Sequence, residues 1–218
     1  MIKAILFDLD GTLIDTNELI IQSFKHAFRK HFNAEMEEQK IIRFFGEPLT
    51  KSMESIDPDN VEILMKYFKD FNEKQHDILA QRYEGTEKAI AILKEKDIRV
   101  GVVTSKRRLM AERSLKLIGV YELMDVIITP EDTDKHKPDG APMLLACERL
   151  GIIPEEAMMV GDSIYDLQCG KNAGSKTCVV TYSSFSMDEL MNYEPDYVVD
   201  RLEELANIID SADEKDAV

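Results

Sequence analysis

The feature that most constrains this chain is the alternation of short apolar, β-branched runs with longer segments of helical periodicity. The apolar runs, each followed by polar residues or glycine, are residues 3–7, 98–103, 126–128, 157–160, 177–180 and 197–199. Helical patterns lie between most of them, at residues 86–96, 106–118, 140–150, 163–173 and 201–210. Nearly continuous apolar runs are typical of parallel strands buried on both faces. The alternation therefore predicts an α/β fold built on a doubly wound parallel sheet.

One long stretch interrupts this alternation. From residue 16 to about residue 82 the sequence has helical spacing and no strand pattern, as in the recurrence of apolar residues from Ile20 to Phe28. We therefore predict an all-helical cap at residues 16–82, inserted into a core formed by residues 1–15 and 83–218. The acidic tail that begins at about Ser211 is expected to be frayed.

The charge of the chain limits the classes of partner. Its 218 residues include 27 Lys and Arg against 42 Asp and Glu, which gives a net charge of −15. Such a surface repels nucleic acids and anionic membranes, so we expect neither as a partner. The first residues lack a signal-peptide pattern and no apolar run approaches the length of a membrane span, so a cytoplasmic location is expected. Nothing in the sequence specifies an oligomeric state.

Polar and charged side chains gather where the predicted strands end. They are Asp8 and Asp10 after the first run, Thr104 and Ser105 after the second, Lys137 before the helical pattern at 140, and Asp162 and Asp166 after the fourth. In an α/β sheet, ligands bind at the carboxyl ends of the strands. We therefore expect these carboxylates, hydroxyls and one ammonium group to line a single site.

The carboxylates of this set suit a magnesium ion. Asp8 and Asp162 can each offer a carboxylate oxygen, and Asp10 can offer its backbone carbonyl from a turn that Gly11 permits. Mg²⁺ prefers oxygen ligands with water completing its coordination shell. A metal would also neutralise a bound phosphate locally, against the acidic surface. Asp166, one helical turn after Asp162, is expected to orient a metal-bound water or a neighbouring lysine.

The same set predicts phosphoryl transfer. Asp8 is the expected nucleophile, and a carboxylate nucleophile gives an aspartyl-phosphate that is then hydrolysed. Asp10 is placed to protonate the leaving oxygen and afterwards to deprotonate the attacking water. Thr104, Ser105 and Lys137 are expected to bind the remaining phosphoryl oxygens, since this chemistry depends mainly on positioning and charge stabilisation.

These segments resemble the signature motifs of the haloacid dehalogenase (HAD) superfamily. Residues 8–12, Asp-Leu-Asp-Gly-Thr, are similar to its first motif, Thr104 and Lys137 to its second and third, and residues 161–166 to its fourth. The predicted cap resembles that of the phosphoglycolate-phosphatase-like branch. The resemblance implies a Rossmann-like core, a Mg²⁺ requirement and an aspartyl-phosphate mechanism. One departure is Gly140, where the third motif usually has proline, and this glycine could loosen the turn.

Segments outside the motifs resemble the bacterial inorganic pyrophosphatases of this superfamily. They are residues 16–20, 57–59, 71–77 and 193–197. The expected substrate is therefore a small phosphorylated compound, with inorganic pyrophosphate as the first choice and 2-phosphoglycolate or another small phosphomonoester as the alternative. A sugar phosphomutase is disfavoured, because Ile20 stands near the place where that branch carries a histidine.

A compact, highly charged substrate requires cationic groups from the cap. The candidates there are Arg43, Lys51 and His76. The run Lys106–Arg108 is interpreted as surface charge, although Lys106 could also serve the substrate from the core side.

Overall fold

The computed structural model describes residues 1–216 of the chain, with side chains as far as Ser211. Its centre is a six-stranded sheet in the order β5-β4-β1-β6-β7-β8, in which every neighbouring pair is parallel. The strands are β1 (Ala4–Phe7), β4 (Arg99–Val103), β5 (Val126–Ile128), β6 (Ala157–Gly161), β7 (Lys176–Val180) and β8 (Tyr197–Val199). The predicted doubly wound parallel sheet is confirmed.

The strand order places a ligand site beside β1. The chain runs outward from β1 to β4 and β5 on one side, and then crosses to β6, β7 and β8 on the other. This is the Rossmann order, in which the reversal of direction leaves a crevice at the carboxyl ends of the two central strands. Here those strands are β1 and β6, so the residues that follow them are the first candidates for a functional site.

Alternate residues of β1 enter two separate cores. Ile5 and Phe7 pack on one face of the sheet with apolar residues of α5, α6 and α10, whereas Ala4 and Leu6 pack on the other with those of α7 and α8. These helices are α5 (Thr86–Glu95), α6 (Arg108–Leu117), α7 (Ala141–Leu150), α8 (Ile164–Ala173) and α10 (Leu205–Asp216), and the short α9 (Met187–Met191) follows β7. Single 3-10 turns lie at η1 (Tyr121–Leu123), η2 (Pro154–Glu156) and η3 (Leu202–Glu204). A sheet covered on both faces explains why its strands are apolar throughout.

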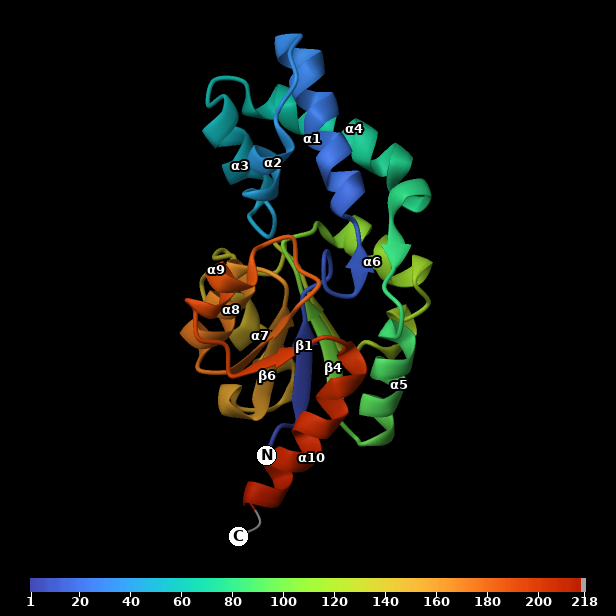
Figure 1. Cartoon of the computed structure of the whole chain (residues 1–218), viewed down its shortest axis with the longest axis vertical. Helices are drawn as coiled ribbons and strands as arrows, with labels where there is room; N and C mark the ends of the chain where they lie inside the picture. The colour runs from blue at the N-terminus through green and yellow to red at the C-terminus, as the bar shows by residue number, and fades with distance from the viewer. Residues whose placement is uncertain (217–218) are drawn as a thin grey trace.

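The helices between β2 (Ile14–Asp15) and β3 (Gln81–Arg82) form a second body, above the sheet in Figure 1. They are α1 (Asn17–Phe32), α2 (Glu38–Ile42), α3 (Leu49–Ile56) and α4 (Val61–Leu79). They pack around their own apolar cluster, in which the rings of Phe24 and Phe68 meet edge to face at 4.9 Å between centroids. The division of the chain at residues 16 and 82 remains a prediction, and we use the word cap for α1–α4.

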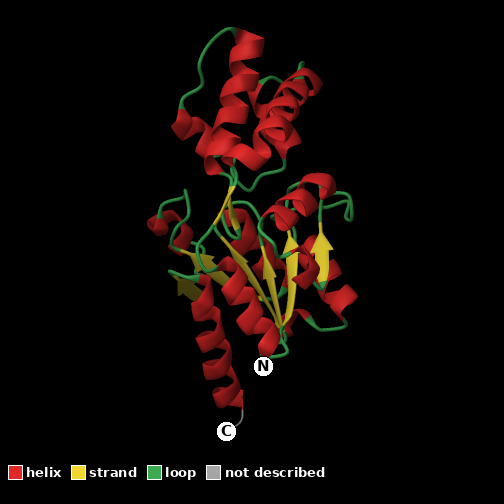
Figure 2. Ribbon diagram, turned by 90° about the vertical axis from the view of Figure 1, so that its right-hand side faces the viewer, coloured by secondary structure: helices red, strands yellow, loops and turns green. Residues whose placement is uncertain are grey.

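A small antiparallel pair joins the cap to the rest of the chain. β2 (Ile14–Asp15) pairs with β3 (Gln81–Arg82), so the outgoing and returning chains run side by side, and Figure 2 shows the narrow connection. The expectation of no strand between residues 16 and 82 is therefore wrong at its end, because two residues are too short to give a readable strand pattern.

The end of the chain also differs from expectation. α10 continues to Asp216, past Ser211, where the sequence predicts a frayed tail; residues 217 and 218 of that tail lie outside the described residues. Of the helices described up to Asp216, none is long and apolar enough to cross a membrane.

Candidate active site

Three central strands end at the residues that the sequence singles out. Asp8 follows β1, Thr104 follows β4 and Asp162 follows β6. All three are buried, with 4%, 6% and 3% of their surface exposed, respectively. The backbone amide of Asp8 donates to the carbonyl of Val160 at 2.8 Å, which keeps the chain in sheet register up to Asp8. These three segments therefore meet at one edge of the sheet, as predicted from the sequence.

A buried lysine ties two of the carboxylates together. Lys137 Nζ lies 2.7 Å from Asp8 Oδ1 and 2.7 Å from Asp166 Oδ1, and the lysine is 2% exposed. The second oxygen of Asp166 accepts hydrogen bonds from the amide and hydroxyl of Ser163, at 3.0 and 2.6 Å. Ser163 caps α8 in return, so the start of that helix fixes Asp166 and Asp166 fixes Lys137.

A glycine lets the first loop approach Asp162. Gly11 has a φ of 82°, and a Cβ atom at this position would lie 2.3 Å from Asp162 Oδ2. The side chain of any other residue would collide with this carboxylate and would also strain the backbone. Gly11 therefore brings the loop that carries Asp8 and Asp10 into contact with the loop after β6.

The charges of this site leave room for a divalent cation. Carboxylate oxygens of Asp8, Asp162 and Asp166 lie within 4.8 Å of one another. Three ionised carboxylates against the single ammonium of Lys137 leave two negative charges uncompensated. Burial raises the pKa of Asp8 to about 7, and burial also raises the pKa of Asp162 well above its usual value, with the charges of Asp166 and Asp8 adding to the effect. A cation with a preference for oxygen fits this donor set, and Asp8 and Asp162 have oxygens to spare for it.

Asp10 lies beside this cluster and has partners of its own. Its Oδ1 accepts a hydrogen bond from Thr16 at 2.7 Å and an ion-paired one from Lys106 Nζ at 2.6 Å. The Lys106 side chain is only 10% exposed. The interpretation of Lys106 as a surface charge is therefore wrong, because the loop after β4 turns its side chain inward to Asp10.

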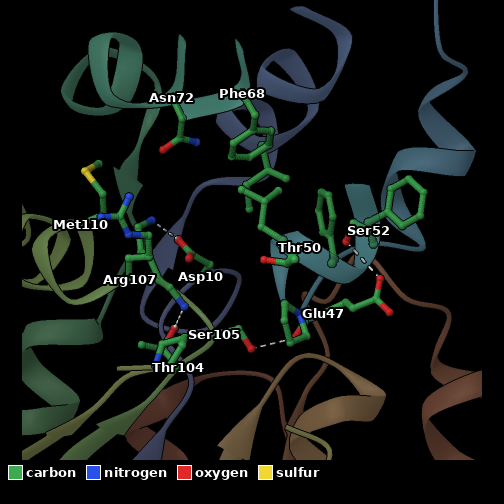
Figure 3. Close-up of a pocket in the computed structure, with 18 of the residues that line it drawn as sticks. Asp10, Glu47, Thr50, Ser52, Phe68, Asn72, Thr104, Ser105, Arg107 and Met110 are labelled. Atoms are coloured by element: carbon green, nitrogen blue, oxygen red, sulfur yellow. Dashed lines mark hydrogen bonds and ion pairs between the residues drawn. The ribbon is translucent and has the colours of Figure 1, made fainter. Parts of the chain in front are cut away.

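A cavity of about 480 Å³ separates the cap from the sheet edge. Asp8, Asp10 and Asp162 line its floor, and its other walls come from α1, α4, residues 44–52 and residues 104–107. Figure 3 shows Asn72, Met110 and Arg107 on one side and Thr50, Ser52 and Glu47 on the other. Any ligand at Asp8 would therefore meet groups from the cap and from the core.

The loop between α2 and α3, which we call the cap loop, touches the core at two points beside this cavity. The hydroxyl of Ser105 donates to the carbonyl oxygen of Gly46 at 3.0 Å. Gly46 has a φ of 76°, and a Cβ atom there would lie 2.6 Å from Ser163 Oγ. The cap is thus seated on the loops after β4 and β6, and a glycine permits this close contact.

The expected cap cations divide into two groups. Lys51 lines the cavity, whereas Arg43 and His76 do not. His76 is fully buried, and its Nε2 lies 2.7 Å from the hydroxyl of Ser114 in α6. His76 therefore packs between α4 and the core and does not face the cavity.

Two cavity residues were not identified from the sequence as binding candidates. Lys69 and Asn72 lie on the face of α4 that also presents Phe68 to the cavity. Their spacing from Phe68 could have indicated a shared face, but not that the face borders a ligand site. Arg107, interpreted as surface charge, also lines the cavity, and only Arg108 of that run turns to a separate network around Asp132.

The departure in the third motif has a packing explanation. Gly140 is buried, and a Cβ atom there would lie 2.7 Å from the backbone nitrogen of Ala173. The side-chain amide of Asn172 donates to the carbonyl of Pro138 at 2.9 Å. The start of α7 is therefore packed against the end of α8, and this close packing accounts for a glycine at position 140.

A family model and the sequences of known proteins place this chain in the same family. The model of the haloacid dehalogenase-like hydrolase family matches residues 5–180. A Clostridium perfringens (strain 13) relative that carries the PpaX name is 46% identical over 210 residues, covering 96% of this chain and 98% of its own. A pyrophosphatase PpaX of Halalkalibacterium halodurans is 40% identical over 208 residues, covering 95% and 97%.

A solved structure agrees with these sequence relatives. A crystal structure from Bacteroides fragilis, described as a haloacid dehalogenase-like hydrolase, superposes with a TM-score of 0.88 at 27% identity and covers 94% of this chain and 100% of its own. The likeness extends over the cap as well as the sheet, because the match spans nearly the whole chain.

Proposed function

Because this chain belongs to the haloacid dehalogenase-like hydrolase family, we propose that it is a Mg²⁺-dependent phosphohydrolase with Asp8 as its nucleophile. The observation that carries the proposal is the buried contact of 2.7 Å between Lys137 Nζ and Asp8 Oδ1, with Asp162 beside it. An acidic side chain with no catalytic role would rarely be held in such surroundings.

The residues that would hold Mg²⁺ are Asp8 and Asp162, with the backbone carbonyl of Asp10. Asp166 belongs to the same acidic group, but both of its oxygens are engaged, one with Lys137 and one with Ser163. Its proposed role is therefore to position Lys137. When bound, Mg²⁺ supplies positive charge that reduces the repulsion between the Asp8 carboxylate and a phosphate.

The reaction divides into two steps at Asp8. In the first, an Asp8 oxygen bonds to phosphorus, the bond from phosphorus to the leaving oxygen breaks, and Asp10 gives that oxygen a proton. In the second, water attacks the aspartyl-phosphate, Asp10 takes a proton from the water, and inorganic phosphate leaves with Asp8 restored. Thr16 and Lys106 hold the Asp10 carboxylate at the cavity, from where it can serve both steps.

Three groups are proposed to bind the transferring phosphoryl group. The ammonium group of Lys137 has three hydrogens, of which two point to Asp8 and Asp166, so one remains for a phosphoryl oxygen. The hydroxyl of Thr104 and the loop at Ser105 line the same cavity. Fixed donors aimed at the phosphoryl oxygens stabilise the charge of the transition state without having to reorganise.

Inorganic pyrophosphate is the proposed substrate. Support comes from the two relatives that carry the PpaX name, which align over nearly the whole of this chain, cap included. The cavity also offers cations, Lys51 and Lys106, to a second phosphate. The alternative is 2-phosphoglycolate, whose carboxylate could use the same cations.

The deciding experiment compares kcat/KM for pyrophosphate and 2-phosphoglycolate at one Mg²⁺ concentration. We expect pyrophosphate to be preferred. A tenfold preference for 2-phosphoglycolate, about 1.4 kcal/mol in transition-state stabilisation, would reject the pyrophosphatase assignment while leaving the phosphohydrolase chemistry in place.

A further inference from the structure

Two cations from different parts of the fold meet on one wall of the cavity. Lys69 comes from α4 of the cap, and Arg107 comes from the loop between β4 and α6 in the core. Among the described side chains, Lys69 has no carboxylate within salt-bridge distance, and Arg107 reaches only Glu131, at 3.9 Å between partly exposed groups. Glu73, one turn after Lys69 on α4, is near enough to offset part of the lysine's charge, but neither cation has a described carboxylate within hydrogen-bond distance.

These two cations act on each other. Burial lowers the pKa of Lys69 and the positive charge of Arg107 lowers it further, whereas the carboxylate of Glu73 acts in the opposite direction without cancelling the shift. Phe68 and Met110, both buried, line the same cavity, so part of the surrounding volume is apolar. Lys69 is partly buried and Arg107 is exposed, so the repulsion between them falls mainly on the lysine, and an anion bound between or beside them would relieve it. Their presence in a chain of net charge −15 makes a random accumulation of cations a poor explanation.

We propose that Lys69 and Arg107 form a second anion subsite that binds the negatively charged leaving group and selects substrates with two anionic groups. The inference rests on the proposed phosphohydrolase function, with the transferring phosphoryl group at Asp8. The rest of the substrate then extends into the cavity that both cations line. A leaving phosphate or carboxylate meets them there, whereas an uncharged leaving group gains nothing from them. One cation comes from the cap and one from the core, so the subsite is complete only when the cap is seated.

The test compares substrates with and without the second anionic group. The enzyme with Mg²⁺ is assayed on pyrophosphate, 2-phosphoglycolate and 4-nitrophenyl phosphate. Selectivity is the ratio of kcat/KM for either substrate with two anionic groups to that for the aryl phosphate, which has one. Lys69→Gln and Arg107→Gln are each expected to lower this ratio at least tenfold. Lys69→Arg keeps the positive charge and is expected to retain most of the wild-type ratio. The matched control is Lys66→Gln, one turn earlier on α4, where the lysine is exposed and paired with Asp70 at 3.0 Å.

The outcomes separate the subsite from the proposed substrate. If Lys69→Gln and Arg107→Gln leave both ratios within about twofold of the Lys66→Gln control, the subsite does not exist. If only the 2-phosphoglycolate ratio responds and pyrophosphate is not hydrolysed, the subsite stands and the pyrophosphatase assignment falls. If no substrate is hydrolysed, calorimetric titration with pyrophosphate and Mg²⁺ still decides: affinity that Lys69→Gln lowers about tenfold supports the subsite, and equal affinity or no binding overturns it.

Discussion

At the scale of single residues, the proposed role of Asp8 as nucleophile can be tested without a change in the size of its buried side chain. Asp8→Asn keeps the size of the side chain and removes one negative charge from the cluster around Lys137, which retains Asp166 as a partner at 2.7 Å. We expect the variant to fold and to release no phosphate above background, because an amide is a poor nucleophile. Phosphate release and thermal unfolding are the measurements. Substantial turnover by pure, folded variant would contradict the covalent mechanism.

The second aspartate can be tested independently of the first. Asp10→Asn should reduce kcat by roughly 10²–10⁴-fold, the usual contribution of a general acid–base group. Lys106 and Thr16 would lose a charged acceptor, so the unfolding temperature is measured beside kcat to confirm that the variant is folded under the assay conditions. Measurement of both half-reactions, by a rapid burst and by steady-state release, should show both slowed. A variant within about threefold of wild type would remove Asp10 from this role.

The residues around the cavity differ in how far their positions could be predicted from the sequence. Asp8, Thr104 and Asp162 could be placed together because parallel strands share a carboxyl edge, which is a property of the fold. Lys69 and Arg107 could not, because their position depends on how the cap sits on the core, and no periodicity in the sequence records that. Short segments such as β3 were missed for a related reason: pairing with a distant partner, and not local propensity, makes them strands.

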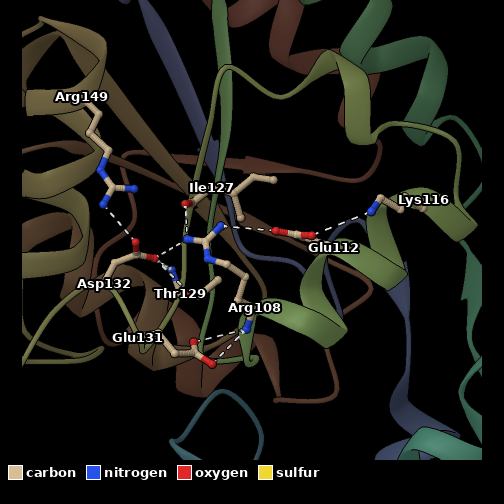
Figure 4. A network of polar contacts seen from close by, with 8 residues as sticks. All are labelled: Arg108, Glu112, Lys116, Ile127, Thr129, Glu131, Asp132 and Arg149. Carbon is tan, nitrogen blue, oxygen red and sulfur yellow. Dashed lines mark hydrogen bonds and ion pairs between the residues drawn. The ribbon is translucent and has the colours of Figure 1, made fainter.

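At the scale of secondary-structure elements, one network ties the loop after β5 to α6 and α7 (Figure 4). Asp132 accepts hydrogen bonds from the amide and hydroxyl of Thr129 at 2.8 and 2.9 Å, from Arg149 at 2.9 Å, and from Arg108. Burial alone would raise the pKa of Asp132, but these donors outweigh it and hold the pKa at about 2. The carboxylate thus fixes the loop that leads to Lys137.

Asp132→Asn should destabilise the fold in a pH-dependent manner. A folded-state pKa of about 2 against an ordinary 3.8 corresponds to about 2 kcal/mol of stability. Because the folded-state pKa is the lower one, this stability is present above about pH 4 and is lost as the pH falls from there toward 2. Denaturant unfolding at pH 7 and pH 3.5 should show the difference between wild type and variant shrinking at the lower pH. Asp134→Asn, at an exposed neighbour in the same loop, is the control, and equal effects of the two substitutions would contradict the assignment.

The cap loop can be tested with a matched pair of glycines. Gly46→Ala places a methyl group 2.6 Å from Ser163 Oγ at a φ of 76°, whereas Gly119→Ala, at a φ of 79°, meets no atom within 4 Å. Both should lose about 1 kcal/mol of stability from backbone strain. Only Gly46→Ala should also lower kcat/KM, since the methyl group would hold the cap off the loop after β6. Equal activity of the two variants would show that cap seating is not needed for turnover.

At the scale of the whole molecule, the acidic cluster under the cap is expected to destabilise the metal-free fold. The chain as a whole is strongly acidic, and its centre holds Asp8, Asp162 and Asp166 against one lysine. Charges buried without compensation cost folding free energy. A cation that binds only the folded state would offset this cost, because binding shifts the equilibrium toward that state.

Asp162→Asn separates the cost of the buried charge from the stabilisation by a bound cation. Burial raises the pKa of Asp162, and the charges of Asp166 and Asp8 add to the rise, so ionising this group at pH 7 destabilises the metal-free fold. In a chelator, wild type should therefore gain stability as the pH falls below 7, and Asp162→Asn should be at least as stable as wild type at pH 7. Mg²⁺ should raise the unfolding temperature of wild type but not of the variant, and the variant should be inactive. Asp188→Asn, at an exposed site in α9, controls for the loss of one negative charge. A variant that is less stable than wild type without metal, or that is stabilised equally by Mg²⁺, would show that Asp162 serves the fold and not the cation.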